Sequence, residues 1–469
     1  GSLFRYVAEE SQKANSRVLE VMTAVRWLST LSAAYALQAD RAVLRKSIKL
    51  PDPVPAEGIA AAVECMESGS LFRYNVKDSD ASQVSQCEAE FAEYTGFKFA
   101  LGLNSCGSAI FLSLKCAGAQ FGDLVLTNGF TFTAVPSAIV HAGCEPVYVE
   151  CTDGLVVDVD DLRIKMDATP SAKYFVVSHM RGKLAEMDAV AALCKERGVV
   201  LLEDCAHSLG VLWNGEHSGH HGKIAAFSSQ SYKLLNSGEG GFFATDDDDA
   251  MATAMAYAGA YEVLAKKHVV VPSQAALDKV MDGSIPNFSL RMHEATAAML
   301  RPQIKTVDQR RSEYNRRYYK VAAMLDALPG VSVPKQLDQV TIVGDSVQFH
   351  VTRDTFASHD ADASAVSKGT DDFLARCLER GLPVELFGSK TNARNFVNWR
   401  YAKQPQCGLP KTAEIISRAF DVRLPLRFED ADFDTIVAIV TEALVETRNT
   451  HGALSKVPAA AKVAADVGA

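Results

Sequence analysis

Short apolar runs alternate with stretches of helical periodicity from about residue 81 onward. The runs are rich in β-branched and aromatic residues, and most are separated by segments whose apolar positions recur every three to four residues. Strands that alternate with helices favour a mainly parallel sheet with both faces covered, an α/β fold. Seven strands are predicted, at Phe99–Leu103, Leu124–Thr127, Pro146–Glu150, Tyr174–Ser178, Val199–Glu203, Ala225–Ser229 and Gly241–Thr245.

The two ends of the chain follow other patterns. Residues 1–50 are rich in alanine, leucine and charge, with helical spacing from Arg17 to Leu44 that Pro51–Pro55 interrupts. Downstream, Met292–Lys320 predicts one long helix that leads into a smaller domain, with a strand from Val340 to Val351 and a helix at Asp371–Arg380. The expected organisation is a helical extension over 1–55, a large domain over 56–310, a small C-terminal domain over 311–450 and a flexible tail over 451–469.

Composition narrows the class of protein. The 469 residues are 48% hydrophobic and 22% charged, enough for a large core and two domains. A net charge of -9 and a pI near 5.7 disfavour nucleic acid or an anionic membrane as partners, and no apolar run is long enough to cross a bilayer. The ten cysteines form no CxxC pair, and His220-His221 lacks an acidic partner at ligand spacing, so we expect a cytoplasmic protein without a metal.

A lysine lies within a loop of small and hydroxyl residues between the last two predicted strands. The loop reads Ser228-Ser229-Gln230-Ser231-Tyr232-Lys233-Leu234-Leu235-Asn236-Ser237-Gly238-Glu239-Gly240-Gly241. Desolvation would keep part of the Lys233 population neutral and able to form a Schiff base, while the Ser228 hydroxyl could hold a phosphate. The alternative, a solvated surface lysine, is the more common case for such a loop read by itself.

Two other strand ends carry candidate chemistry. After the first strand, Asn104-Ser105-Cys106-Gly107-Ser108 opens a helix whose free N–H groups suit a phosphate, although a simple N-cap has the same composition. After the fifth strand, Asp204 would need a cation such as a protonated pyridine nitrogen if it is buried, or it caps the next helix. Open sheets bind ligands at the carboxyl ends of their strands, so we expect these groups and Lys233 to converge.

Taken together, these motifs resemble those of the DegT/DnrJ/EryC1/StrS aminotransferase family, pyridoxal-phosphate enzymes of fold type I that aminate keto-sugars. The resemblance runs from about Phe72 to the 440s. Its matching text is Phe72-Arg73-Tyr74-Asn75, Thr131-Phe132-Thr133-Ala134, Ser178-His179-Met180, Glu203-Asp204-Cys205-Ala206-His207, Phe227-Ser228, Gly238-Glu239-Gly240-Gly241 and Arg291-Met292-His293-Glu294.

The resemblance implies a role for each matching residue. Lys233 would carry the cofactor as a Schiff base, Asp204 would pair with the pyridinium nitrogen, Phe132 would stack on the ring, and His207 would contact the ring 3-oxygen. Ser228 and the amides around Gly107 and Ser108 would hold the phosphate. Here the sequence departs from the family, because Ser105-Cys106-Gly107 replaces its usual Ser/Asn-Gly-Thr.

The resemblance also implies a homodimer with shared active sites. Arg291 would bind the carboxylate of the amino donor, and Asn287 or Ser289 would replace a family asparagine that reaches the phosphate of the neighbouring subunit. A further cluster, Arg394 with Trp399, Arg400 and Tyr401, could line the acceptor site or cap the small domain.

The function expected on this basis is transfer of an amino group from an amino acid, glutamate, to a keto or aldehyde group of a sugar-like acceptor. Pyridoxal phosphate acts as the electron sink in such a reaction. Two alternatives remain open. The same cofactor could serve elimination, racemisation or decarboxylation, or the chain could be a non-catalytic regulator or partner subunit with this fold.

Overall fold

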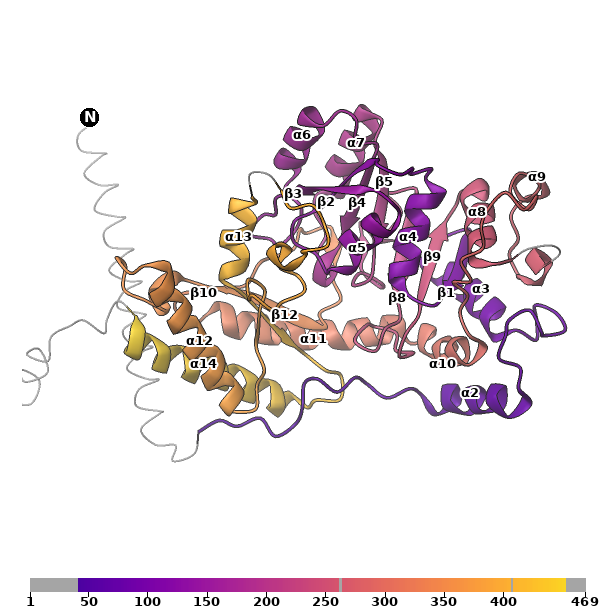
Figure 1. Ribbon diagram of the computed structural model, residues 1–469. Helices are drawn as coiled ribbons and strands as arrows, with labels where there is room; N and C mark the ends of the chain where they lie inside the picture. Colours follow the sequence, from indigo (N-terminus) through magenta and orange to yellow (C-terminus); the bar gives the residue numbers. More distant parts are fainter. Residues whose placement is uncertain (1–40, 261–263, 406–407, 453–469) are drawn as a thin grey trace, which may run out of the picture.

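A seven-stranded sheet forms the centre of the computed structural model, which describes residues 41–260, 264–405 and 408–452 (Figure 1). The strand order is β1-β9-β8-β5-β4-β2-β3, and only β9 runs antiparallel to its neighbours. All seven predicted strands are confirmed, four of them with bounds shifted by one residue. The strands are β1 (Phe99–Leu103), β2 (Leu124–Asn128), β3 (Glu145–Val149), β4 (Tyr174–Ser178), β5 (Val200–Asp204), β8 (Ile224–Ser228) and β9 (Gly241–Thr245).

Helices cover both faces of this sheet. Successive side chains of a strand point to opposite faces, so in β4 Phe175 and Val177 join one hydrophobic core while Tyr174 and Val176 join another. This two-sided burial explains why the strands read as continuous apolar runs. The helices around the sheet are α3 (Gln83–Thr95), α4 (Cys106–Cys116), α5 (Ala134–His141), α6 (Val159–Ala168), α7 (Met187–Arg197), α8 (Asp248–Ala258) and the short α9 (Gln274–Asp278).

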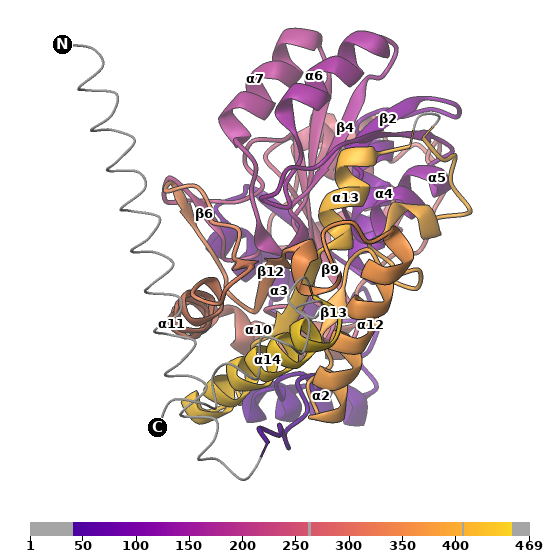
Figure 2. The same cartoon turned by 90° about the vertical axis from the view of Figure 1, so that its left-hand side faces the viewer.

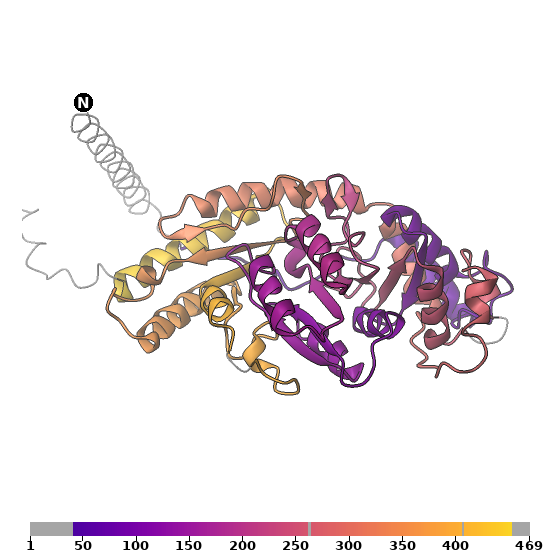
Figure 3. The ribbon, with the colours of Figure 1, turned by 90° about the horizontal axis from the view of Figure 1, so that it is seen from above.

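A four-stranded antiparallel sheet, in the order β10-β12-β14-β13, forms the second layer of the molecule. In the view from above, α11 runs along one edge of the molecule from the large sheet to this smaller one (Figure 3). The elements here are β10 (Val331–Ser332), β12 (Ser346–Val351), β13 (Glu385–Leu386), β14 (Ala419–Arg423), α10 (Glu294–Ile304), α11 (Val307–Asp326), α12 (Ala363–Glu379), α13 (Pro410–Ser417) and α14 (Asp430–His451). Among the described residues, no helix has the length and apolarity that a bilayer span requires.

Three expectations for this region are wrong in detail. The single helix expected over Met292–Lys320 is two helices, because α10 contains Pro302 and ends at Ile304, and Thr306 then precedes α11. The strand expected over Val340–Val351 is also two. Val340–Thr341 (β11) pairs with β6 (Leu212–Trp213), which forms a hairpin with β7 (Glu216–His217), and only β12 belongs to the small sheet. The helix expected at Asp371–Arg380 begins earlier, at Ala363.

Residues 41–55 form an extended segment rather than a helix, and we call residues 41–52 the strap. The strap runs beside α12 and α14 and leads to α2 (Ala56–Ser68), as Figures 1 and 2 show. The Leu44 amide donates to the Arg380 carbonyl at 2.8 Å, Leu44 and Ile48 are buried, and Lys46 pairs with Asp432. The helix expected from Arg17 therefore does not include Leu44, and its residues up to 40 lie outside the described part, as does the expected tail from residue 453.

Candidate active site

Most of the predicted site residues line one cavity of about 440 Å³. Parts of its wall come from the segments that follow the carboxyl ends of β1, β2, β5 and β8, as expected for an open parallel sheet. The lining residues are Ser105, Cys106, Gly107, Ile110, Phe132, Ala134, Val135, Asp204, Ala206, His207, Ser228, Gln230, Tyr232, Lys233, Glu239, Arg394 and Arg423.

The loop that carries Lys233 is closed by its own backbone. The Ser229 amide donates to the Gly240 carbonyl at 3.0 Å, and the Ser231 amide donates to the Gly238 carbonyl at 3.1 Å. A Cβ at Gly240 would lie 2.4 Å from the Ser229 hydroxyl, and one at Gly241 would lie 2.5 Å from the Cys106 amide nitrogen. Glycine is therefore required at both positions, and this close approach brings the lysine loop against the start of α4.

Lys233 is partly buried and lies in an unusual electrostatic environment. Burial, and then the guanidinium charges of Arg181 and Arg423, lower the pKa of Lys233 to about 7. Its Nζ lies 2.8 Å from His207 Nε2. Burial and the Lys233 charge hold the pKa of His207 well below its ordinary value, so this imidazole is neutral. At neutral pH a substantial fraction of Lys233 is therefore an uncharged, nucleophilic amine.

Asp204 is buried at the end of β5, within a hydrogen-bond network that sequence reasoning missed. Its Oδ2 accepts from the Ser178 hydroxyl at 2.7 Å, and its Oδ1 accepts from the Ala206 amide at 3.1 Å. Ser178 is fixed in turn by two 3.0 Å hydrogen bonds between its backbone and the Asn128 amide group. The sequence motif that contains Ser178 does not reveal this role, because its partner Asp204 lies 26 residues away in the chain.

The start of α4 and the end of β8 form the expected phosphate region. Ser105 Oγ accepts from the Ser108 amide at 3.1 Å, which caps the helix. Cys106 and Gly107 line the cavity, and their amides come before the first intrahelical hydrogen bond. Ser228 also lines the cavity, and its Oγ accepts from the Gln230 amide at 3.3 Å. The N-cap and phosphate interpretations of this helix start are therefore compatible.

Two arginines from the smaller sheet and its loops, Arg394 and Arg423, also line the cavity. Arg394 lies over the half-exposed Phe132 ring, 5.7 Å from its centroid, and Arg423 ends β14. Arg181 follows β4 in a left-handed conformation with φ 58°, is buried, and pairs with Asp421 of β14. Neither Arg181 nor Arg423 was predicted as a site residue. The available signal was an Asp and an Arg flanking Val422 in an otherwise apolar strand.

Four predicted residues do not line this cavity. Ser108 is engaged within α4, where its hydroxyl donates to Asn104 Oδ1 at 2.6 Å. Asn287 Oδ1 accepts from the Ser289 amide at 2.6 Å, and both residues lie in an exposed turn. Arg291 donates from Nη1 to the carbonyls of Ala258 and Gly259 at 3.2 and 3.3 Å. Within one chain these contacts are local.

In the other predicted cluster, Arg394 with Trp399, Arg400 and Tyr401, the residues differ in their roles. Trp399 is buried and donates from Nε1 to the Ala393 carbonyl at 2.8 Å, and the Tyr401 hydroxyl donates to the Thr133 carbonyl at 2.9 Å. These residues pack the loop, whereas Arg394 lines the cavity.

The lining residues fit pyridoxal phosphate. None of the ion pairs among the described residues involves Asp204, so its buried carboxylate can accept a cationic ring nitrogen. His207 Nδ1 is buried without a hydrogen-bond partner, which leaves this atom available to a ring oxygen. The helix start with Ser228 suits a phosphate.

A second group of polar side chains lies at the same sheet. The ligand-type atoms of His179, Glu203 and Cys205 lie within 4.8 Å of one another and are buried. The 2.8 Å contact between His179 Nε2 and Glu203 Oε2, together with the 2.5 Å hydrogen bond from the Gly222 amide to Glu203, already satisfies the carboxylate. This cluster is an internal hydrogen-bonded pair at the end of β5.

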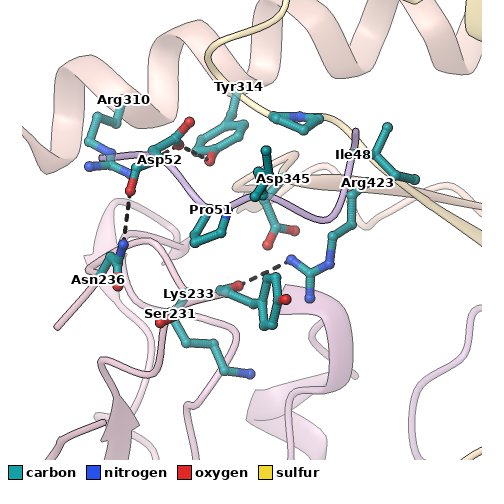
Figure 4. A pocket seen from close by; sticks show the side chains of 13 residues that line it. Ile48, Pro51, Asp52, Ser231, Lys233, Asn236, Arg310, Tyr314, Asp345 and Arg423 are labelled. Carbon is teal, nitrogen blue, oxygen red and sulfur yellow. Dashed lines mark hydrogen bonds and ion pairs between the residues drawn. The ribbon is translucent and has the colours of Figure 1, made fainter. Parts of the chain in front are cut away.

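A smaller cavity adjoins the lysine loop on the side of the strap (Figure 4). Asp52 accepts from the Tyr314 hydroxyl at 3.1 Å and pairs with Arg310 at 3.4 Å, and its carbonyl accepts from Asn236 Nδ2 at 2.8 Å. Asn236 lies three residues after Lys233, so the strap contacts the lysine loop directly.

Comparisons with known proteins identify the family of the chain. The sequence profile described as the DegT/DnrJ/EryC1/StrS aminotransferase family matches residues 56–441. The spore coat polysaccharide biosynthesis protein SpsC of Bacillus subtilis (strain 168) is 30% identical over 305 residues, which are 62% of this chain and 73% of that protein. The L-glutamine:2-deoxy-scyllo-inosose aminotransferase of Streptomyces lividus is 30% identical over 301 residues, 64% of this chain and 69% of that protein.

A solved structure supports the same fold. The crystal structure of 3-amino-5-hydroxybenzoic acid (AHBA) synthase matches with a TM-score of 0.71 and 22% identity, covering 86% of this chain and all of that one (100%). The chain therefore belongs to the DegT/DnrJ/EryC1/StrS aminotransferase family, a family of pyridoxal-phosphate-dependent aminotransferases.

Proposed function

We propose that this enzyme moves an amino group from an amino-acid donor, glutamate, to a keto or aldehyde group of a sugar-like acceptor. The single observation that carries the proposal is the Lys233 amine, with a pKa near 7, beside the neutral His207 in a cavity that also contains the buried Asp204. The names of relatives support the acceptor class, since one of them aminates 2-deoxy-scyllo-inosose. That name also makes glutamine the second donor to test.

The residues divide the work by their chemistry. Bound pyridoxal phosphate would supply an electron sink for the carbon that gains or loses the amino group. Lys233, as a neutral amine, would hold the cofactor and then carry a proton to and from that carbon. Asp204 would keep the ring nitrogen protonated, His207 would contact the ring oxygen, Phe132 would cover the ring face, and Ser228 with the Cys106 and Gly107 amides would bind the phosphate.

The proposal includes a homodimer in which each site is completed by the other subunit. Because Arg291, Asn287 and Ser289 do not line the cavity of their own chain, any contact they make with cofactor or substrate requires a second copy. α2 presents Ile59, Val63 and Met66 as exposed apolar side chains on one side of the helix, a surface that a second chain would bury.

The first test concerns Lys233 and the cofactor. The purified protein should be yellow with pyridoxal phosphate, and borohydride reduction followed by peptide mapping should find the pyridoxyl mass on Lys233. Lys233→Ala should abolish turnover, because no other lining amine can hold the cofactor covalently. A pyridoxyl mass on a different lysine would overturn the site assignment.

The second test concerns the reaction. Glutamate should yield 2-oxoglutarate in one-to-one stoichiometry with an aminated product when a panel of keto-sugars is offered. Keto acid formed without an aminated product would favour elimination or another reaction of the same cofactor. Absence of turnover by the purified protein, with recovery on addition of a partner protein, would favour a regulatory or partner subunit.

A further inference from the structure

Arg423 is a cavity-lining guanidinium without an acidic partner. It ends β14 and lies over the Tyr232 ring, 4.8 Å from the centroid. Its Nη1 donates to the Tyr232 carbonyl at 3.2 Å. Among the ion pairs of the described residues, none involves Arg423. An arginine has five N–H donors in a planar fork, so most of its hydrogen-bonding capacity is unused here.

Two of the three nearby carboxylates, those of Asp421 and Glu385, are already engaged by other arginines. Asp421 accepts from Arg181 and from Gln348 Nε2, the latter at 2.9 Å. Glu385 pairs with Arg394 at 3.0 Å and lies 3.8 Å from Arg181. Asp345 lines the small cavity next to Arg423 but makes no ion pair with it. None of these three acids therefore forms an ion pair with Arg423.

Arg394 adds a second cation to the same wall. Its guanidinium lies 5.7 Å from the Phe132 centroid and 5.9 Å from the Phe387 centroid, and its Nε is buried without a hydrogen-bond partner. Burial and the Arg181 charge lower the pKa of Arg394 to about 10, and the same two causes lower the pKa of Arg423. Holding these like charges together costs free energy that a bound anion would recover.

We propose that Arg423, together with Arg394, binds a carboxylate carried by a substrate of this enzyme. The proposal rests on the proposed function only in taking this cavity as the substrate cavity. A guanidinium fork matches a carboxylate in shape and charge, and the two arginines would fix the substrate in the cavity that Asp204 and Ser228 also line. Both substrates of an aminotransferase enter the same cavity in turn. The carboxylate can therefore come from the amino donor or from an acid group on the acceptor.

Binding measurements on the cofactor-loaded protein test the subsite without turnover. Glutarate, a dicarboxylate with no group to react, should bind in calorimetric titrations, and its neutral analogue glutaramide should not. Arg423→Gln should weaken glutarate binding about tenfold to a hundredfold, and Arg423→Lys should weaken it less, because lysine keeps the charge and loses the fork. Arg418→Gln is the matched control, since Arg418 is bonded to Glu414 and Asp153 outside the cavity.

The cofactor phosphate is the competing occupant. Titration of cofactor-free protein with pyridoxine 5′-phosphate, a form of the cofactor that carries the phosphate but cannot react with Lys233, should give the same affinity for the parent protein and for Arg423→Gln. A large loss of cofactor affinity in Arg423→Gln, with glutarate binding unchanged, would overturn the proposal and assign Arg423 to the phosphate. Circular dichroism and the melting temperature identify any variant that fails to fold, and Arg423→Lys then carries the test.

Half-reactions separate the two sources of the carboxylate. If the donor supplies it, Arg423→Gln should raise the glutamate concentration needed for half-maximal conversion of the cofactor. If the acceptor supplies it, a keto-sugar acid should outperform the matching neutral keto-sugar only when Arg423 is present. If neither substrate depends on Arg423, the proposal fails even if transamination is established. If glutarate binding depends on Arg423 and no amino transfer occurs, the subsite stands and the proposed function fails.

Discussion

The chemistry of the site depends on how single side chains are solvated. Lys233 has an ordinary pKa of 10.5 as an exposed lysine, and its environment lowers this value to about 7. In a protein without cofactor, the folded state therefore binds fewer protons than the unfolded state between these two values. Burial of Lys233 therefore lowers the free energy of unfolding. This destabilisation is largest below pH 7, declines as the pH rises, and vanishes above pH 10.5.

Because of this cost, replacing Lys233 by an uncharged residue should increase the stability of the folded protein by an amount that depends on pH. In cofactor-free protein, Lys233→Met should raise the melting temperature at pH 6 to 7, because methionine occupies similar space without a charge. The gain should shrink as the pH rises to 9, by up to about 1.4 kcal/mol for each pH unit. Thermal unfolding of both proteins across this range measures it. A gain that is independent of pH would show that the Lys233 charge is not the cause.

Asp204 offers a second prediction at this scale. Asp204→Asn keeps the size of the side chain and can still bond to Ser178, but it removes the charge that would hold the ring nitrogen protonated. Turnover should fall by about a hundredfold or more, while some cofactor still binds. Ser178→Ala should have a smaller effect, because it removes only one hydrogen bond from the carboxylate. Near-normal turnover of Asp204→Asn would contradict the assigned role.

At the scale of helices and strands, the sequence predicts those elements that follow from a local pattern of apolar and polar residues. The seven strands are apolar runs such as Phe99–Leu103 bounded by polar residues, so their identity is clear. Leu44 and Ile48 are four residues apart and both buried, a spacing typical of a helix, yet they belong to the extended strap. Their apolar side chains pack against other elements, and tertiary contacts of this kind leave no local signature. Ser178 and Arg423 were missed as site residues for the same reason.

A substitution in the strap should change stability, although the strap is distant in sequence from Lys233. Asp52→Ala removes the hydrogen bond that Asp52 accepts from Tyr314 and the ion pair that it forms with Arg310. The side chains of Asp52 and Arg310 are only 13% and 14% exposed. The free energy of unfolding should fall by roughly 1–3 kcal/mol, because both partners lose their acceptor.

Hydrogen exchange and a control localise this effect. In Asp52→Ala, amide exchange should accelerate in the peptide covering 229–240, since the strap contacts that loop through Asn236. Asp434→Ala removes an exposed pair with Lys320, and its stability should stay within experimental error. If the two variants behave alike, the strap does not hold the lysine loop.

For the whole molecule, the assembly determines whether the predicted residues around 290 take part in catalysis. Arg291 is bound to local carbonyls, and Phe288 beside it is 57% exposed. Both facts are consistent with a segment that a second subunit would cover. No local sequence pattern could predict the contacts of this segment, because its partner is another copy of the chain.

Subunit mixing tests the shared site. Lys233→Ala and Arg291→Ala should each be inactive alone, and an equal mixture under conditions of subunit exchange should recover about a quarter of the parent activity. Half of the dimers would then be mixed, with one of their two sites intact. Activity and sedimentation of the mixture measure this recovery. An active species that sediments as a monomer, or a mixture without recovery, would exclude sites shared between subunits.

The pairing of β11 with β6 has a mechanical consequence. Val340 and Thr341, on the path from α11 to the small sheet, form main-chain hydrogen bonds with Trp213 and Leu212 of a hairpin attached to the large sheet. A hinge at this place would have to break those bonds before the two halves could swing apart. A bulky acceptor therefore has to enter through movement of side chains and short loops at the cavity mouth, such as those bearing Phe132 and Arg394. The large and small sheets keep their relative position during this movement.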